Sequence, residues 1–204
     1  MSAKFAQQRL EGDLSEQIRL AAERIILEDA DHKTTVVLID GHAGSGKSMI
    51  AQALREEIFK TTLDAPTLIH MDDLYPGWEG LRAGSLYLIR EILEPLSRSQ
   101  RATWQVWDWE RSSRGRPGEA GNGFRESAGG NIVIVEGCGS LSKRAKELAA
   151  LGIWIDADAE RRAIRLKDRD GDRFAVEMAL WATQETEFYN DEASRDLADL
   201  VLTN

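Results

Sequence analysis

The feature that most constrains this chain is the glycine-rich stretch IDGHAGSGKS, which runs from Ile39 to Ser48. It follows the aliphatic run TTVVLID and precedes KSMIAQALREEIF, whose apolar spacing predicts a helix. Glycines let the backbone curl so that successive N–H groups point inward, and the helix that follows adds its positive N-terminal end. The stretch therefore predicts an anion-binding loop between a buried strand and a helix.

The loop matches the pattern G-x-x-x-x-G-K-[ST] in full, which is the P-loop signature of a nucleoside triphosphate site. In such a loop Lys47 reaches the β- and γ-phosphates and the Ser48 hydroxyl ligates Mg²⁺. We therefore expect ATP and Mg²⁺ as cofactors; the alternative, a glycine-rich turn that binds nothing, does not explain the flanking strand and helix. The expected nucleotide contacts are Gly41, His42, Ala43, Gly44, Ser45, Gly46, Lys47, Ser48, Met49 and, from a later helix, Arg162.

Short runs that are apolar throughout alternate with helical patterns along the rest of the chain. Strands are expected at 34–40, 67–72, 103–109, 132–137, 153–158 and 198–204, and helices at 13–28, 47–59, 85–95, 140–152, 159–170 and 174–193. Pro95 and Gly152 are expected to end their helices. Strands buried on both faces between helices predict an α/β doubly wound parallel sheet of about five strands.

The length and the pattern predict a single domain over residues 1–204. Within it we expect an N-terminal helical region at 1–33, a glycine-rich loop at 110–130 and a basic lid helix at 159–172.

The net charge of -9 opposes binding to nucleic acid or to an anionic membrane, because phosphate contacts need clustered cations. It does not exclude small phosphorylated ligands. The one cysteine, Cys138, cannot form an intrachain disulfide, and no window has the length and apolarity of a signal peptide or a membrane span. The expectation is a cytoplasmic protein.

Carboxylates follow two of the expected strands. Asp72 and Asp73 end the second strand, and Glu136 ends IVIVEG. Strand ends at one edge of such a sheet surround the bound ligand, where a carboxylate can accept the proton of an attacking hydroxyl or support Mg²⁺. We expect Asp72 or Asp73 to act as base, and Ser48, Glu136 and Asp72 to lie near the metal. The alternatives are a turn acid at a helix cap and a carboxylate paired with a base.

The helix AERRAIRLKDRD carries Arg162, Arg165 and Arg169 at spacings of three and four, which places them on one face. Converging guanidinium groups suit the charge on a transferring phosphoryl group, and we assign Lys47, Asp72, Arg165 and Arg169 to the chemistry. The alternative is a solvated basic face.

In these pieces the chain resembles the uridine kinases and their phosphoribulokinase-like relatives. The matching segments are IDGHAGSGKS, MDDLY, WDWERSSR, IVIVEG and DADAERRAIRLKDRD, in the family's order over most of residues 35–170. The resemblance implies an adenylate-kinase-like P-loop fold with a helical lid, Mg·ATP as donor, Asp72 as base and Arg162, Arg165 and Arg169 on the lid. It aligns Arg114 with an arginine that binds the acceptor. Family members are often oligomers, so a homo-oligomer is among the expectations.

The acceptor half departs from the family pattern. YPGWEGL stands where the family has Phe-Asp-His-Pro, so Glu79 is the candidate to replace the family's ribose-binding aspartate, and Trp107 stands at a family tyrosine. The expected acceptor-binding residues are Asp73, Tyr75, Trp78, Glu79, Trp107 and Arg114. The tryptophans at 78, 107 and 109 either stack on a flat acceptor or pack inside the protein.

The sequence therefore predicts a kinase that phosphorylates a hydroxyl of a small molecule, with uridine or cytidine as the leading acceptor. Two alternatives stay open. One is the same chemistry on a sugar, a vitamin, a nucleoside monophosphate or another metabolite. The other is a non-catalytic protein that binds ATP as a regulatory switch.

Overall fold

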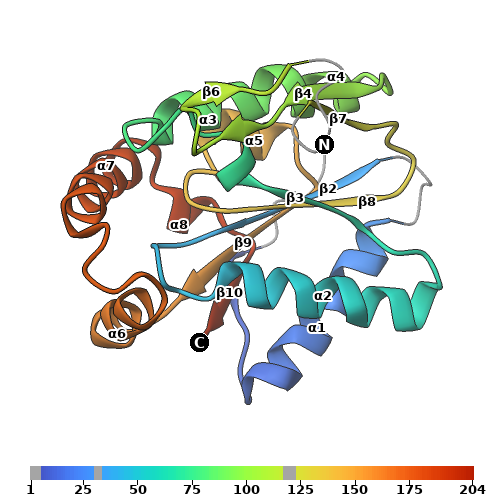
Figure 1. The fold of residues 1–204 in the computed structure, drawn as a ribbon. Helices are drawn as coiled ribbons and strands as arrows, with labels where there is room; N and C mark the ends of the chain where they lie inside the picture. Colours follow the sequence, from blue (N-terminus) through green and yellow to red (C-terminus); the bar gives the residue numbers. More distant parts are fainter. Residues whose placement is uncertain (1–5, 30–33, 117–122) are drawn as a thin grey trace.

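The computed structural model describes residues 6–29, 34–116 and 123–204. At its centre is a six-stranded sheet in the order β1, β10, β9, β2, β8, β3, in which every neighbouring pair is parallel (Figure 1). The strands are β1 (Gln8–Arg9), β2 (Thr35–Asp40), β3 (Thr67–His70), β8 (Ile132–Glu136), β9 (Leu151–Asp156) and β10 (Leu200–Thr203). The expected doubly wound α/β sheet is confirmed, with the two-residue β1 as an additional edge strand.

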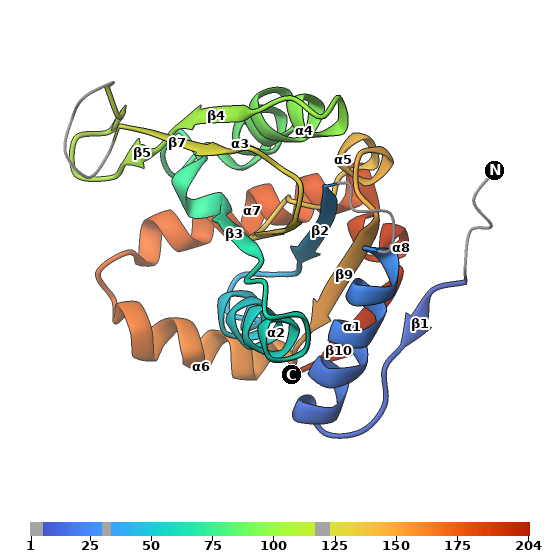
Figure 2. The same ribbon diagram turned by 90° about the vertical axis from the view of Figure 1, so that its right-hand side faces the viewer.

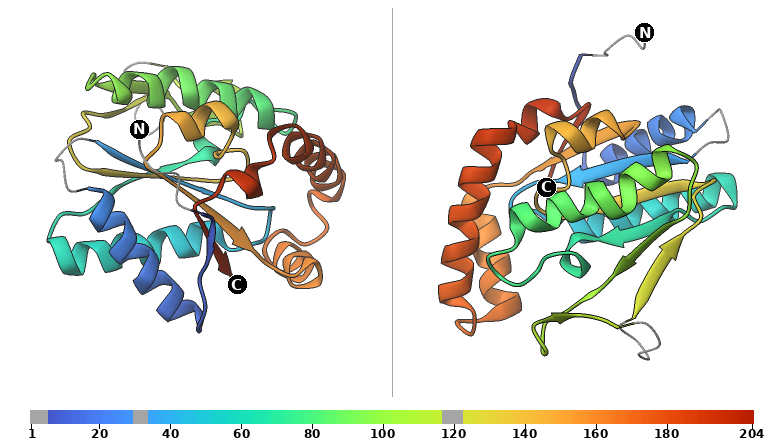
Figure 3. Two further views of the ribbon diagram at one scale, coloured as in Figure 1. Left: turned by 180° about the vertical axis from the view of Figure 1, so that it is seen from behind. Right: turned by 90° about the horizontal axis from the view of Figure 1, so that it is seen from above.

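Helices cover both faces of this sheet, as the views from the side, from behind and from above show (Figures 2 and 3). One face carries α1 (Leu14–Glu28) and α2 (Lys47–Thr62). The other carries α3 (Leu81–Leu88), the π-helix η2 (Ile89–Leu93), α4 (Glu94–Ser97), α5 (Lys143–Glu147), α7 (Ala175–Glu192) and α8 (Ser194–Leu197). The helix α6 (Ala159–Asp170) lies with α7 beyond the edge where β2 ends (Figure 1).

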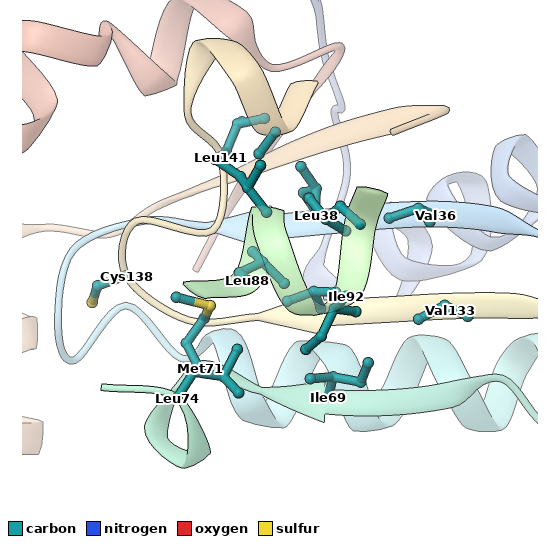
Figure 4. Packing of buried hydrophobic residues seen from close by; sticks show 14 of the residues in the cluster. Val36, Leu38, Ile69, Met71, Leu74, Leu88, Ile92, Val133, Cys138 and Leu141 are labelled. Atoms are coloured by element: carbon teal, nitrogen blue, oxygen red, sulfur yellow. The ribbon is translucent and has the colours of Figure 1, made fainter. Parts of the chain in front are cut away.

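The strand β2 shows why the strands of this sheet are mostly apolar. Val37 and Ile39 pack into the cluster under α1 and α2, whereas Val36 and Leu38 pack into the cluster on the opposite face. Successive side chains of a strand point to opposite faces, so a strand covered on both sides is apolar along its middle, and its polar residues Thr35 and Asp40 stand at its two ends. Figure 4 shows part of the cluster on this opposite face, in which Cys138 lies beside the glycine-rich loop.

Residues 102–116 and 123–127 form an arm beside the central sheet instead of adding a strand to it. The strand β4 (Ala102–Gln105) pairs antiparallel with β7 (Phe124–Ser127), and β5 (Trp107–Asp108) pairs with β6 (Ser113–Arg114). The expected strand at 103–109 is thus two short strands in two small ribbons. The segment 110–130, expected as a loop, contains β6 and β7, while its residues 117–122 lie outside the described residues.

Two expected helix ends are wrong. Pro95 does not end its helix, because the π-helical turn before it leads into α4, where proline takes one of the first two positions and needs no N–H partner. Gly152 lies inside β9, while α5 ends at Glu147. A Cβ at Gly152 would lie 2.9 Å from Leu141, so this glycine permits close packing of strand and loop.

Within the described part of the chain, no helix combines the length and apolarity that crossing a membrane requires.

Candidate active site

The glycine-rich loop connects the carboxyl end of β2 to the first turn of α2. Gly44 and Gly46 have φ angles of +77° and +93°, in the left-handed region that favours glycine. A Cβ at Gly44 would lie 2.7 Å from the carbonyl oxygen of Arg162, and one at Gly46 would lie 2.2 Å from Nδ2 of Asn204. The loop is therefore curled and closely covered, as a cradle for an anion must be.

Lys47 points back into this loop. Its Nζ donates hydrogen bonds to the carbonyl oxygens of Gly41 (2.8 Å) and His42 (3.0 Å) and lies 3.3 Å from Sγ of Cys138. Burial alone would lower the pKa of the ammonium group, but the Cys138 sulfur and the Asp40 carboxylate oppose this effect, and the pKa is raised. Lys47 therefore carries its charge at the centre of the loop.

Glu136, Ser48 and His70 meet at the ends of three neighbouring elements. Oε1 of Glu136 accepts a hydrogen bond from Oγ of Ser48 at 3.0 Å and lies 2.6 Å from Nδ1 of His70. His70 is the direct partner of Glu136 in the register between β3 and β8, and its hydrogen bond with Glu136 raises the pKa of the imidazole. A hydroxyl and a carboxylate at this distance are oxygen ligands of the kind Mg²⁺ takes beside phosphates.

The two aspartates after β3 have different surroundings. Asp72 lines the cavity beside the loop, whereas Oδ2 of Asp73 lies 3.4 Å from Nε of Arg125 in β7. Asp72 reaches solvent through the cavity, but the surrounding protein reduces the hydration of its carboxyl and so raises its pKa, and the negative charge of Glu136 raises it further. The fold thus gives different surroundings to two neighbouring carboxylates, either of which the residues alone allowed as the base.

The basic helix α6 lies over the glycine-rich loop. Arg162 donates to the carbonyl oxygen of Ala43 at 3.4 Å, and Arg165 donates to those of Gly44 and Ser45 at 3.3 and 3.4 Å. Arg165 and Arg169 line the cavity, and Arg169 also forms an ion pair with Asp170 at 2.7 Å. The helix is therefore placed as a cover on the loop.

One cavity of about 390 Å³ joins these groups. One wall of it is apolar and mostly aromatic, formed by Tyr75, Trp78, Trp109, Met178 and Trp181; this set is called the aromatic wall below. Trp78 is at the centre of the wall, with its ring centroid 5.4 Å from that of Trp109 and 6.3 Å from that of Trp181. The cavity thus combines charged groups at the loop with an apolar surface at this wall.

Most of the site residues expected from the sequence, for nucleotide, metal, chemistry or acceptor, line this cavity. Those that do are Ala43, Gly44, Gly46, Lys47, Ser48, Met49, Asp72, Tyr75, Trp78, Glu136, Arg165 and Arg169. The His42 side chain packs against Tyr189, with 4.9 Å between the ring centroids, and Ser45 is fully buried. Tyr75 is itself buried, and its hydroxyl donates a hydrogen bond to the carbonyl oxygen of Cys138 at 2.7 Å.

Four expected acceptor residues lie outside this cavity lining, and one of them is Asp73, which pairs with Arg125. Glu79 is exposed to solvent, and Trp107 packs beside Arg114. The Arg114 guanidinium lies 3.9 Å from the centroid of the Tyr87 ring and donates to the carbonyl oxygens of Leu74 and Gln105. It thus holds the arm against the loop that follows β3.

The sequence analysis did not assign four residues that surround the glycine-rich loop. Asp40 accepts the N–H groups of Gly41, Gly139 and Leu141. Its burial raises its pKa to about 6. The other three are Cys138, Glu185 and Trp181, which meet behind the loop. A single Glu or Trp in a helix carries no signal of such a contact, because its partners lie far away in the sequence.

No family model and no curated protein sequence matches this chain. Solved structures do match. A possible uridine kinase from Bacillus stearothermophilus is 17% identical with a TM-score of 0.65, covering 93% of this chain and 98% of that one. A putative fructose transport system kinase from Silicibacter sp. TM1040 is 15% identical with a TM-score of 0.61, covering 90% and 98%. The protein YGR205w is 12% identical with a TM-score of 0.52, covering 95% and 94%.

These likenesses, together with the parallel sheet and the loop at the end of β2, define the fold as that of P-loop kinases. This is the fold that the resemblance of the sequence to the uridine kinases and their phosphoribulokinase-like relatives implied.

Proposed function

We propose that this chain transfers the γ-phosphate of Mg·ATP to a hydroxyl group of a small molecule, with a nucleoside such as uridine or cytidine as the leading acceptor. The observation that carries the proposal is the single cavity, which joins the Lys47 loop, the Asp72 carboxylate and the Arg165–Arg169 face of α6. Phosphoryl transfer needs little more than positioning, charge compensation and a group to accept the hydroxyl proton.

The curled loop fits the triphosphate of ATP. Its glycines leave no room for side chains, and its lysine is charged. Ser48 and Glu136 would hold Mg²⁺, which when bound neutralises charge on the phosphate oxygens. Lys47 then positions the phosphates, while Arg165 and Arg169 face the charge that spreads over the transferring group.

Asp72 is the proposed general base. It lines the cavity beyond the loop, at the side from which an acceptor between the loop and the aromatic wall would present its hydroxyl. A carboxylate with a raised pKa accepts a proton more readily than an ordinary one. The neighbouring residue Asp73 forms an ion pair with Arg125, and we assign it no role in proton transfer.

The aromatic wall supports a nucleoside as the acceptor, because indole rings offer flat apolar surfaces for a base. The same chemistry on a sugar, a vitamin or a nucleoside monophosphate is the second candidate. It is favoured by the position of Glu79, which is outside the cavity lining and so not placed to grip ribose hydroxyls.

The deciding experiment measures ADP release from Mg·ATP with a panel of nucleosides, nucleoside monophosphates, sugars and vitamins. We expect release that depends on one acceptor class and disappears in Asp72→Asn. Binding of ATP without acceptor-dependent release by any member would contradict the proposal and favour a regulatory ATP-binding protein.

A further inference from the structure

Glu185 in α7 is a buried carboxylate whose hydrogen-bonding partners come from three separate segments. Its Oε1 accepts hydrogen bonds from the backbone N–H of Ala43 at 2.7 Å, from Sγ of Cys138 at 3.0 Å and from Nε1 of Trp181 at 3.1 Å. Its Oε2 lies 3.0 Å from Nδ1 of His42. Only 3% of the residue is exposed.

The carboxylate is held in its charged form. Burial alone would raise the pKa of Glu185, but hydrogen bonds from His42 and Cys138 and the charge of Lys47 outweigh it, and the pKa is lowered. A buried carboxylate of this kind is expensive unless each oxygen is satisfied, and removing a partner leaves a costly charge. The free energy of this buried charge therefore depends on the position of every group that bonds to it.

The partners of Glu185 belong to two parts of the cavity, the glycine-rich loop and the aromatic wall, which meet at this carboxylate. His42 and Ala43 are in the glycine-rich loop, on which Lys47 also depends through the His42 carbonyl. Trp181 is in the aromatic wall and packs against Tyr75 at 4.8 Å and against Trp78 at 6.3 Å between ring centroids. Glu185 is thus a direct bridge between groups about 140 residues apart in the chain.

We propose that Glu185 is a positioning residue that couples the phosphate loop to the aromatic wall, so that the order of one depends on the other. The inference rests on the proposed function, because it takes the loop as the nucleotide site and the wall as the acceptor site. It assigns Glu185 no contact with either substrate.

This coupling differs from ordinary packing of α7. Tyr189, one turn further along the helix, already attaches α7 to the loop through hydrogen bonds to Asp40 and Gly41 at 2.8 and 3.1 Å. Glu185 adds the connection to Trp181 and the wall. A substitution in the aromatic wall should therefore change the affinity for nucleotide through Glu185. It should do so only while Glu185 accepts hydrogen bonds from both Ala43 and Trp181.

The test is a double-mutant cycle on nucleotide binding, with Mg·AMP-PNP as the probe and isothermal titration calorimetry as the measurement. The variants are Glu185→Gln, Trp181→Phe and the pair combined. Glu187→Gln is the matched control, because Glu187 is an exposed glutamate of the same helix. Thermal unfolding is recorded for every variant.

We expect Glu185→Gln to weaken binding about tenfold, because the neutral amide keeps one acceptor oxygen and gives up the charge-assisted bonds to the loop. Trp181→Phe should weaken it about threefold by removing one donor from the network. The combined variant should match Glu185→Gln alone within about twofold, and the control should match wild type.

Effects that multiply in the combined variant would overturn the coupling, since the two residues would then act independently. Unchanged or tighter binding in Glu185→Gln would overturn the positioning role. If Glu185→Gln does not fold, Trp181→Phe decides alone, and unchanged affinity there overturns the inference. Failure of the wild-type chain to bind Mg·AMP-PNP would overturn the proposed function itself, which is a distinguishable result.

Discussion

At one end of the cavity, consecutive residues curl around the position proposed for the phosphates, and most of the hydrogen-bonding groups they offer come from the backbone. At the other end, the aromatic wall is assembled from the loop after β3, the arm and α7. The first end depends on glycines whose left-handed φ angles few other residues adopt. The second depends on side-chain packing that many sequences could supply. The donor end is therefore constrained locally and the acceptor end only by the tertiary structure.

The largest expected effect separates the two aspartates at the boundary between these ends. Asp72→Asn should lower kcat by about 10³-fold, because an amide cannot accept the hydroxyl proton. Asp73→Asn is the matched control and should stay within a few-fold of wild type, since Asp73 pairs with Arg125. Acceptor-dependent ADP release measures both. Equal losses in the two variants would contradict the distinction drawn here.

At the donor end, Lys47→Met should reduce kcat/KM for ATP by about 10²- to 10³-fold, since it removes the positive charge aimed at the phosphates. The acceptor KM should change little. Steady-state kinetics with each substrate varied in turn checks this, with Lys60→Met on the exposed last turn of α2 as the control. A loss confined to the acceptor KM would show that the two ends were assigned the wrong way round.

At the acceptor end, Trp109→Ala should raise the acceptor KM by about tenfold, because one stacking surface is worth on the order of 1–3 kcal/mol. The KM for ATP should not change. Trp109→Phe should recover part of the loss, and Glu79→Gln should match wild type because Glu79 is exposed outside the cavity lining. A strong effect of Glu79→Gln on the acceptor KM would restore its expected role in gripping the acceptor.

The smallest expected effect is a pH dependence. Asp72 must be ionised to accept a proton, and its pKa is raised by reduced hydration and by the charge of Glu136. Activity should be full above this raised pKa and should fall about tenfold per pH unit below it. The acid limb of the pH profile of kcat/KM should therefore lie above the ordinary aspartate value. A limb at or below the ordinary value would contradict Asp72 as the base.

The sequence by itself determined the architecture and the donor end. Apolar runs such as TTVVLID predict buried parallel strands, because a strand covered on both faces is apolar along its middle. The loop from Gly41 to Ser48 could be recognised because its function depends on consecutive residues. The boundaries that failed, at Pro95 and Gly152, failed where packing decided the role of a residue that usually ends a helix.

Only the tertiary structure decided the rest. Arg125 distinguishes Asp73 from Asp72, and it comes from a ribbon that the sequence analysis expected to be loop. Glu185 and Trp181 are one ordinary helical pair in the sequence, and Glu185 meets Ala43 because α7 packs against the end of β2. Contacts between segments far apart depend on how helices and strands pack, and no local spacing encodes them. This is why the curled loop could be predicted as a unit, whereas of the aromatic wall the sequence named Tyr75, Trp78 and Trp109 but neither Met178 nor Trp181.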